Sequence, residues 1–242
     1  MSIKSELSVR SRPGVGSLRT KASPFDTMAL KYDAWFEGEG KFIFATEVEA
    51  FRKCLPLLPK PWIEVGVGSG RFAQALGIEN GIDPSPNLLA IAKGRGINVS
   101  LAKGEECFFD EETFGTVFLI VTLCFVDSPL AVLQQLYRVL KPKGKLVLGL
   151  VLHDSPWGQF YISKKKEGHP FYKHANFYSY EEMVGLLQHT GFTVEKVLST
   201  LFQKPGKVTA MEMPNEGLSP DAGFTVVVAS KSPERSKNQT KR

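Results

Sequence analysis

A glycine-rich segment contains the residues best suited to chemistry: Glu64-Val65-Gly66-Val67-Gly68-Ser69-Gly70-Arg71. It follows a short apolar run at 62–65 and precedes a helical pattern at 71–76, which predicts a turn between a strand and a helix. Open α/β sheets bind ligands at such turns, and glycine lets the backbone approach a ligand because it has no Cβ. The dinucleotide-binding pattern needs a glycine where Arg71 stands, so the segment argues against a dehydrogenase. A purely structural turn without a ligand is the alternative.

Three acidic positions follow other expected strands. Asp83 ends a strand at 81–83, where it could accept both hydroxyls of a ribose or cap the next helix. Glu105 and Glu106 follow a strand at 97–101, where either could accept the exocyclic amine of adenine or stay solvated. Together with the glycine turn (residues 64–71), these acids predict an adenosine ligand. A nucleoside triphosphate is not expected, because no GxxxxGK[ST] segment is present.

The elements that must position these residues alternate between strands and helices. Apolar runs and turn residues predict strands at 62–65, 81–83, 97–101, 116–121 and 146–152, and a final pair at 192–201 and 223–229. Helices are indicated after Ser85-Pro86, after Asp127-Ser128-Pro129, and after a capping box at Ser179 and Glu182. This alternation predicts an α/β fold with a doubly wound sheet.

Charge and composition point to one domain with two basic ends. The net charge of +5 arises because residues 1–24 and 231–242 each carry +4, which leaves −3 for the middle. We expect both ends to be disordered tails and residues 25–230 to form the domain. Scattered cysteines at 54, 107 and 124 indicate buried free thiols, and the lack of a signal peptide or a long apolar segment favours a cytoplasmic protein.

The sequence resembles the class I S-adenosylmethionine-dependent methyltransferases of type 11. The matching stretches are IEVGVGSGRF (63–72), GIDPS (81–85), AKGEE (102–106) and VLKPKGKLVLG (139–149), where Lys143 stands in a position often held by glycine. FLIVTLCFVDSP (118–129) and HPFYKHANFYS (169–179) are similar to uncharacterised prokaryotic small-molecule methyltransferases. The resemblance covers about residues 30–230. It implies a Rossmann-like, mostly parallel sheet of seven strands in the order 3-2-1-4-5-7-6, with helices on both faces and an N-terminal helical lid at 25–56.

The resemblance also implies roles for single residues. Glu64 would engage the methionine end of S-adenosyl-L-methionine, Asp83 would hold the ribose, and Thr122 would place its carbonyl close to the sulfonium. Either Glu105 or Glu106 would face the adenine, and both assignments stay open. The predicted cofactor-binding residues are Tyr32, Glu64, Gly66, Val67, Gly68, Gly70, Asp83, Pro84, Glu105, Glu106 and Thr122. The product would be S-adenosyl-L-homocysteine.

The acceptor side is less well defined by the sequence. The insertion at 153–180 holds three of the four histidines and many aromatic residues, so His153, His169, His174 and Tyr172 are the candidates for catalysis. The segment Tyr32-Asp33-Ala34-Trp35-Phe36 could close over the cofactor or simply pack in the core. Apolar residues at 123–126, after the fourth strand, argue against methylation of a nucleic-acid base. No acid and histidine pair has the spacing of a metal site.

The sequence therefore predicts a methyltransferase acting on a small molecule, as a monomer or homodimer, with no nucleic-acid partner, membrane association or metal. Two alternatives remain open at this point. One is a non-catalytic protein that binds S-adenosylmethionine or S-adenosylhomocysteine. The other is an RNA methyltransferase guided by the basic tails, which would bind with steep salt dependence.

Overall fold

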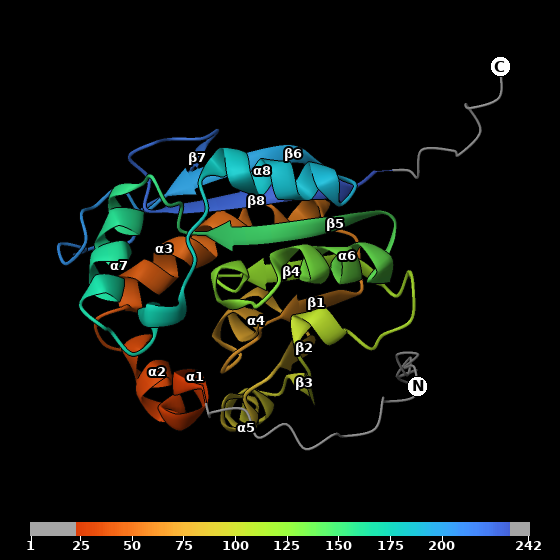
Figure 1. Cartoon of the computed structure of the whole chain (residues 1–242), viewed down its shortest axis with the longest axis horizontal. Coiled ribbons are helices and arrows are strands. Elements are labelled where there is room, and N and C mark those ends of the chain that lie inside the picture. Colours follow the sequence, from red (N-terminus) through yellow and green to blue (C-terminus); the bar gives the residue numbers. More distant parts are fainter. Residues whose placement is uncertain (1–22, 233–242) are drawn as a thin grey trace.

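The computed structural model describes residues 23–232, which form a central sheet with helices on both faces (Figure 1). The strands are β1 (Trp62–Val65), β2 (Asn80–Asp83), β3 (Asn98–Leu101), β4 (Phe114–Ile120), β5 (Leu140–Leu150), β6 (Phe192–Thr200), β7 (Asn215–Glu216) and β8 (Phe224–Lys231). The helices are α1 (Pro24–Thr27), α2 (Ala29–Trp35), α3 (Lys41–Arg52), α4 (Arg71–Leu76), α5 (Pro86–Gly94), α6 (Pro129–Val139), α7 (Pro156–Lys166) and α8 (Tyr180–His189). The basic tails predicted at 1–24 and 231–242 lie outside the described residues, apart from two residues at each inner end.

The sheet has the order β3-β2-β1-β4-β5-β8-β6-β7. Its first five strands run parallel, and β8 pairs antiparallel with both β5 and β6. The predicted α/β doubly wound fold is confirmed, and the predicted order holds for seven strands, with β8 as the seventh. The structure adds β7, whose two exposed residues pair with β6. Two residues are too few to show an alternating pattern, so this strand could not be predicted from the sequence.

Two apolar clusters hold the helices against the sheet. One cluster joins α3, α4 and α5 to one face and includes Phe51, Phe72 and Leu89. The other joins α6 and α8 to the opposite face and includes Leu133 and Leu187. Figure 1 shows α6 and α8 in front of the sheet and α3 behind it. β4 is buried along its whole length, as expected of a strand that is covered on both faces.

The predicted helix starts are confirmed by their caps. Ser85 and Ser128 each accept a hydrogen bond from a backbone N–H in the first turn of α5 and α6, and a proline follows each serine. Ser179 and Glu182 form the complete capping box of α8. Local sequence therefore determines where these helices begin.

β5 begins earlier than the sequence indicates. We expected Pro142 and Gly144 to end helix α6 and the strand to begin at 146, but β5 already starts at Leu140, which pairs with Phe114. The register then shifts before Thr116 pairs with the strand. This irregularity lets the chain continue as a strand through Pro142, because a bulge relaxes the ladder locally.

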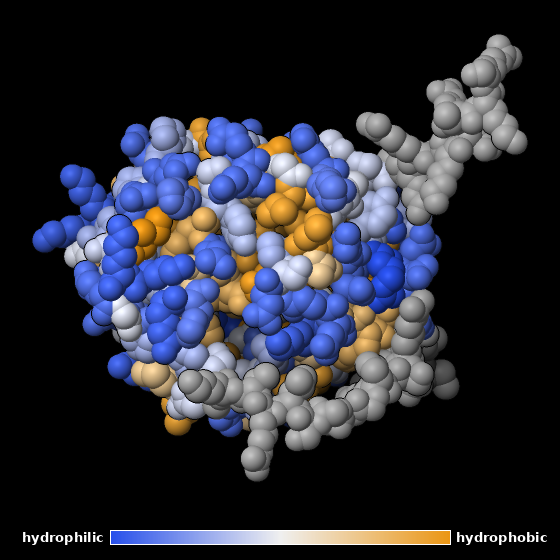
Figure 2. Space-filling view, viewed as in Figure 1, coloured by the Kyte–Doolittle hydropathy of each residue, from blue (hydrophilic) through white to orange (hydrophobic). Residues whose placement is uncertain are grey.

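All parallel strands direct their carboxyl ends to one edge of the sheet. In Figure 1 this edge faces left, toward α1, α2 and α7. It is the edge at which open α/β sheets bind ligands. The visible surface in Figure 2 is mostly hydrophilic, with apolar residues in separate patches. Among the helices of residues 23–232, none is long and apolar enough to cross a membrane.

Candidate active site

Asp83 joins the end of β2 to the glycine turn after β1. The backbone N–H of Gly68 donates to its Oδ2 at 3.0 Å, and the backbone N–H of Ser85 donates to its Oδ1 at 2.8 Å. Each carboxylate oxygen can accept two hydrogen bonds, so each keeps one lone pair for a ligand. Asp83 is only 7% exposed, and burial raises its pKa to about 6. This arrangement can accept two adjacent hydroxyl groups.

The three glycines of the turn have positive φ angles and different surroundings. Their φ values are 75° at Gly66, 53° at Gly68 and 80° at Gly70. A Cβ at Gly66 would lie 2.3 Å from the Thr122 side chain, and one at Gly70 would lie 3.0 Å from helix α5. At Gly68 the nearest atom would be a ring carbon of Tyr32, 3.8 Å away. Close packing therefore requires Gly66 and Gly70, whereas a Cβ at Gly68 would make only an ordinary van der Waals contact with Tyr32.

Glu64 is a buried acid of β1 whose Oε2 has no hydrogen-bond partner. It is 2% exposed, and burial, with a smaller effect from Asp83, raises its pKa well above the usual value. Within residues 23–232, no ion pair joins Glu64 or Asp83 to a basic side chain. An unpaired buried acid is costly, and a cationic ligand would stabilise it. The site can therefore hold a cationic nucleoside.

The two acids after β3 have different environments. Oε1 of Glu105 accepts hydrogen bonds from the backbone N–H groups of Asp127 and Ser128, at 3.0 and 3.2 Å. Glu105 thus anchors the loop that leads into α6. Glu106 is exposed on the same short helical turn. Which of the two faces an adenine stays a prediction, and the free carboxylate of Glu106 favours Glu106.

The end of β4 is strained next to the glycine turn. Val121 has a φ of 49°, a region that β-branched residues rarely adopt. The following residue, Thr122, donates its hydroxyl to the carbonyl of Ile120 at 2.9 Å, and its own carbonyl accepts from the backbone of Phe125 at 2.9 Å. Backbone strain of this kind gathers at functional sites, so it supports a binding role for this edge.

The predicted cofactor-binding residues therefore surround the carboxyl ends of β1, β2 and β4. Two residues of the predicted set have other surroundings: Val67 packs against Gly81, and Pro84 is exposed. Their contacts with a cofactor stay predictions.

Helices α1 and α2 are tied to this edge by two acids. On α1, Asp26 accepts a hydrogen bond from the hydroxyl of Ser85 at 2.7 Å. On α2, Asp33 forms ion pairs with Arg71 at 2.7 Å and Arg95 at 2.8 Å. Burial alone would raise the pKa of Asp33, but the two guanidinium groups hold it below its usual range. Arg71, which occupies the place of the dinucleotide-binding glycine, thus anchors the predicted lid.

An aromatic cluster extends from α1 and α2 to the insertion. The Tyr32 ring lies 5.4 Å from that of Phe25 and 5.8 Å from that of Phe171. Phe25 also packs against Phe125, after β4, at 4.9 Å. Segments that are far apart in the sequence therefore meet around Tyr32, next to the glycine turn.

The structure separates the four candidates for catalysis. His169 stacks on Tyr172 with ring centroids 4.7 Å apart, and its buried Nδ1 has no hydrogen-bond partner. Burial, together with Lys164, lowers the pKa of His169. His174 is exposed, and His153 is 48% exposed and lies 2.6 Å from the carboxylate of Asp154. Of these four residues, only His169 and Tyr172 are connected to the cluster around Tyr32. The connection runs through Phe171, whose ring contacts both Tyr32 and His169.

Sequence reasoning missed Glu47, a buried acid on α3. It is 7% exposed, and burial raises its pKa to about 8. Its charge acts on Tyr161 and Tyr172, whose rings lie 4.5 Å apart. A signal was present in the sequence, because Glu47 stands four residues after Ile43 and four before Phe51. This spacing places an acid on the inner, apolar face of the helix.

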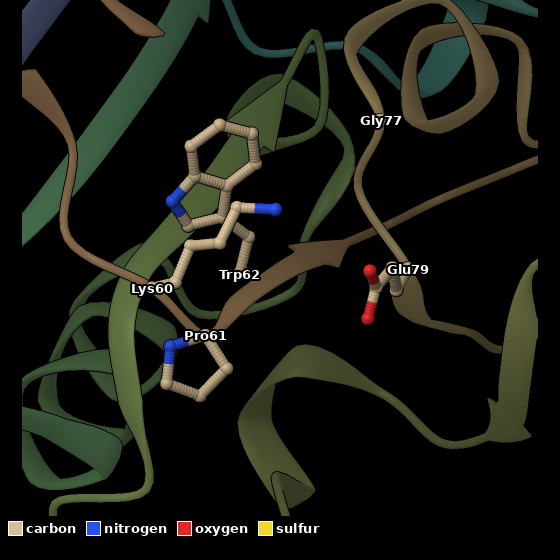
Figure 3. A pocket seen from close by; sticks show the side chains of 5 residues that line it. All are labelled: Lys60, Pro61, Trp62, Gly77 and Glu79. Carbon is tan, nitrogen blue, oxygen red and sulfur yellow. The ribbon is translucent and has the colours of Figure 1, made fainter. Parts of the chain in front are cut away.

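One cavity lies away from this site. It measures about 260 Å³ and is lined by Lys60, Pro61, Trp62, Gly77 and Glu79 (Figure 3). Trp62 begins β1, so this cavity is at the amino end of the strand, opposite the glycine turn. In Figure 3 the Lys60 side chain extends beside Trp62, with its ammonium 4.4 Å from the ring centroid. Among residues 23–232, no group of three acid, histidine or cysteine side chains could hold a metal ion.

Comparisons with known proteins agree with this geometry. A family described as "Methyltransferase domain" matches residues 63–148. An uncharacterised protein of Mycobacterium tuberculosis is 39% identical over 203 residues, which cover 83% of this chain and 71% of that protein. An uncharacterised protein of Methanocaldococcus jannaschii is 37% identical over 207 residues, which cover 86% of this chain and 98% of that protein. A solved structure from Thermotoga maritima, described as a SAM-dependent methyltransferase and possible histamine N-methyltransferase, is 36% identical with a TM-score of 0.80. The match covers 86% of this chain and 98% of that one.

The fold and these matches define a methyltransferase domain. The chain belongs to the class I S-adenosylmethionine-dependent methyltransferases.

Proposed function

We propose that this protein transfers the methyl group of S-adenosylmethionine to a small-molecule acceptor and releases S-adenosylhomocysteine. The observation that carries the proposal is the carboxylate of Asp83. It is fixed by the N–H groups of Gly68 and Ser85 and keeps a lone pair on each oxygen. This is the arrangement that the two hydroxyls of a ribose need.

The chain's own residues would bind the two ends of the cofactor. Asp83 would hold the ribose, and Glu64, whose Oε2 has no hydrogen-bond partner, would stabilise the positively charged methionine end. Gly68 has no Cβ, so the cofactor would lie close to its backbone. When bound, the cofactor supplies an electrophilic methyl group. The protein must then align the acceptor and exclude water. Helices α1 and α2, in the predicted lid at 25–56, would exclude the water.

A small acceptor fits the surroundings better than a nucleic acid. The turn after β4 is apolar, with Leu123 and Cys124 buried. Aromatic side chains of α1, α2 and the insertion enclose the same edge. The Thermotoga maritima protein is described as a possible histamine N-methyltransferase, and histamine is a small molecule.

The test is transfer of label from methyl-labelled S-adenosylmethionine to fractions of a cell extract, with full-length protein. We expect label in small molecules, and none with the Asp83→Ala protein. Label in RNA alone would contradict the small-molecule acceptor. Cofactor binding without any transfer would contradict catalysis and indicate a binding protein.

A further inference from the structure

The cavity beside Trp62 lies at the opposite edge of the sheet from the glycine turn, and the proposed function gives it no role. Two chain segments form its walls: 60–62, which leads into β1, and 77–79, which joins α4 to β2 (Figure 3). Its volume of about 260 Å³ is below the range of about 300–1,000 Å³ that is usual for drug-sized ligands. A ligand of this cavity must therefore be small.

Backbone hydrogen bonds to neighbouring strands hold both walls in place. On one side, the carbonyl of Pro61 accepts from the backbone N–H of Gly115 at 2.9 Å. On the other side, the carbonyl of Glu79 accepts from the backbone N–H of Asn98 at 2.8 Å. The cavity is therefore preformed, which reduces the ordering that a ligand would have to impose.

The two walls carry charges of opposite sign. In Figure 3 the Lys60 ammonium and the Glu79 carboxylate point into the space between the walls. The Trp62 ring, 4.4 Å from that ammonium, favours its position through a cation–π contact. Among residues 23–232, neither Lys60 nor Glu79 forms an ion pair, with each other or with a third side chain. Both charges are therefore available to a ligand.

The rest of the lining is apolar or lacks a side chain. Pro61 and Trp62 are half-buried and give one wall an apolar surface. Gly77 ends helix α4, and a Cβ at this position would meet no atom within 4 Å. The carbonyl groups of a last helical turn favour a cation, as does the Glu79 carboxylate. One wall thus suits an anion beside apolar surface, and the other suits a cation.

We propose that this cavity binds a small zwitterion, namely a free α-amino acid with an apolar side chain. Its carboxylate would pair with Lys60, its ammonium group with Glu79, and its side chain would pack on Pro61 and Trp62. A zwitterion is favoured over an ion of one sign, because an anion is repelled by Glu79 and a cation by Lys60. The site is separate from the proposed cofactor site, so both can be filled at once.

The test is titration of the isotope-labelled full chain with L-leucine, followed through the indole N–H signals of its three tryptophans in nuclear magnetic resonance spectra. Trp62→Phe identifies the signal of Trp62. We expect leucine to shift this signal saturably, with a Kd in the millimolar range, because exposed ion pairs contribute little. Leucine should bind more tightly than 4-methylpentanoate, which lacks the ammonium group, or 3-methylbutylamine, which lacks the carboxylate.

Substitutions test the two charges one at a time. Lys60→Gln and Glu79→Gln should each weaken leucine binding by about fivefold, the upper end for an exposed ion pair. In Lys60→Gln the advantage of leucine over 3-methylbutylamine should vanish, and in Glu79→Gln its advantage over 4-methylpentanoate should vanish. Lys93→Gln removes an exposed charge that does not line the cavity, and it should bind leucine as the native protein does.

A matched pair of glycine substitutions tests the cavity itself. Gly77 and Gly96 lie just past the ends of α4 and α5, with φ values of 71° and 84°, and neither has an atom within 4 Å of an added Cβ. Asparagine tolerates this backbone conformation. Gly77→Asn should therefore fill the cavity and block leucine binding, whereas Gly96→Asn should leave it unchanged.

Three results would overturn the proposal. The first is a Trp62 signal that leucine does not shift saturably. The second is equal affinity for the three probes, or native leucine binding by Lys60→Gln, Glu79→Gln and Gly77→Asn. The third is displacement of leucine by S-adenosylhomocysteine, which would place leucine in the cofactor site. None of these results bears on methyl transfer, so the proposed function stands or falls separately.

Discussion

Asp33 on α2 and Arg71 at the start of α4 form an ion pair of 2.7 Å in which each side chain is 15% exposed. The same carboxylate reaches Arg95 at 2.8 Å. One acid thus joins α2 to the start of α4 and to the end of α5. We propose that this ion-pair network holds the predicted lid over the proposed cofactor site.

Removing this acid should release the lid. In Asp33→Asn, two guanidinium groups lose a partly buried anion, and we expect a loss of about 1–3 kcal/mol in the free energy of unfolding. S-adenosylhomocysteine should dissociate about tenfold faster, as stopped-flow fluorescence would measure. Glu37→Gln is the control, since Glu37 also pairs with Arg71 but is exposed. Equal dissociation rates of S-adenosylhomocysteine in both variants would show that the ion pair between Asp33 and Arg71 does not close the site.

The glycine turn allows a matched pair of substitutions. A Cβ at Gly66 would lie 2.3 Å from Thr122, so Gly66→Ala should destabilise the fold by about 2 kcal/mol or more. A Cβ at Gly68 meets nothing closer than Tyr32, so Gly68→Ala should cost only about 1 kcal/mol, from its positive φ. In the proposed complex the cofactor lies against the backbone of Gly68, so the added Cβ should weaken cofactor binding far more than stability. Denaturant unfolding would measure the stability of both variants, and calorimetry would measure their cofactor binding. Normal binding by Gly68→Ala would contradict the proposed position of the cofactor.

Lys143 gives a prediction about stability alone. It is exposed, and its φ of 61° lies in the region that favours glycine. Lys143→Gly should therefore stabilise the protein by about 0.5–1 kcal/mol, the relieved strain less the entropy of the unfolded glycine. Lys141→Gly, an exposed position of the same strand without positive φ, should destabilise it. Chemical denaturation would measure the free energy of unfolding of both variants. A lower stability of Lys143→Gly would contradict the predicted backbone strain at Lys143.

Glu47 should make stability depend on pH. The folded protein keeps the proton on this side chain up to about pH 8, whereas the unfolded chain releases it near 4.5. The folded state therefore binds more protons across this interval, and stability must fall as pH rises through it. Glu47→Gln should remove a fall on the order of 3–5 kcal/mol between pH 4.5 and 8. Urea unfolding at several pH values would measure it, and the same fall in both proteins would contradict the raised pKa.

Local sequence predicted the α/β class and the helix starts, whereas the strand order followed from the family resemblance. The glycine turn and the serine caps are defined by residues that are close in the chain, so their types and spacing sufficed. Lys143 has a left-handed backbone, which agrees with the resemblance, since it implied a position that favours glycine.

Long-range contacts are what the sequence did not supply. Asp33 and Arg71 are 38 residues apart, and nothing in either segment specifies the partner of the other. Glu47 acts electrostatically on Tyr161 and Tyr172, which lie far from it in the sequence. The insertion offered three histidines and Tyr172 as candidates, but only His169 and Tyr172 pack together, whereas His153 and His174 are exposed.

The most direct test of this account is the affinity of S-adenosylhomocysteine for native protein and for Asp83→Asn, measured by calorimetry from pH 5 to 8. We predict tight binding by native protein above pH 6, with a loss of about tenfold per pH unit below it as Asp83 gains a proton. Asp83→Asn should bind at least about a hundredfold more weakly, with no such pH dependence. Glu195→Gln, which neutralises an acid paired with Lys145, should behave as the native protein. Binding by Asp83→Asn with native affinity would contradict the central claim.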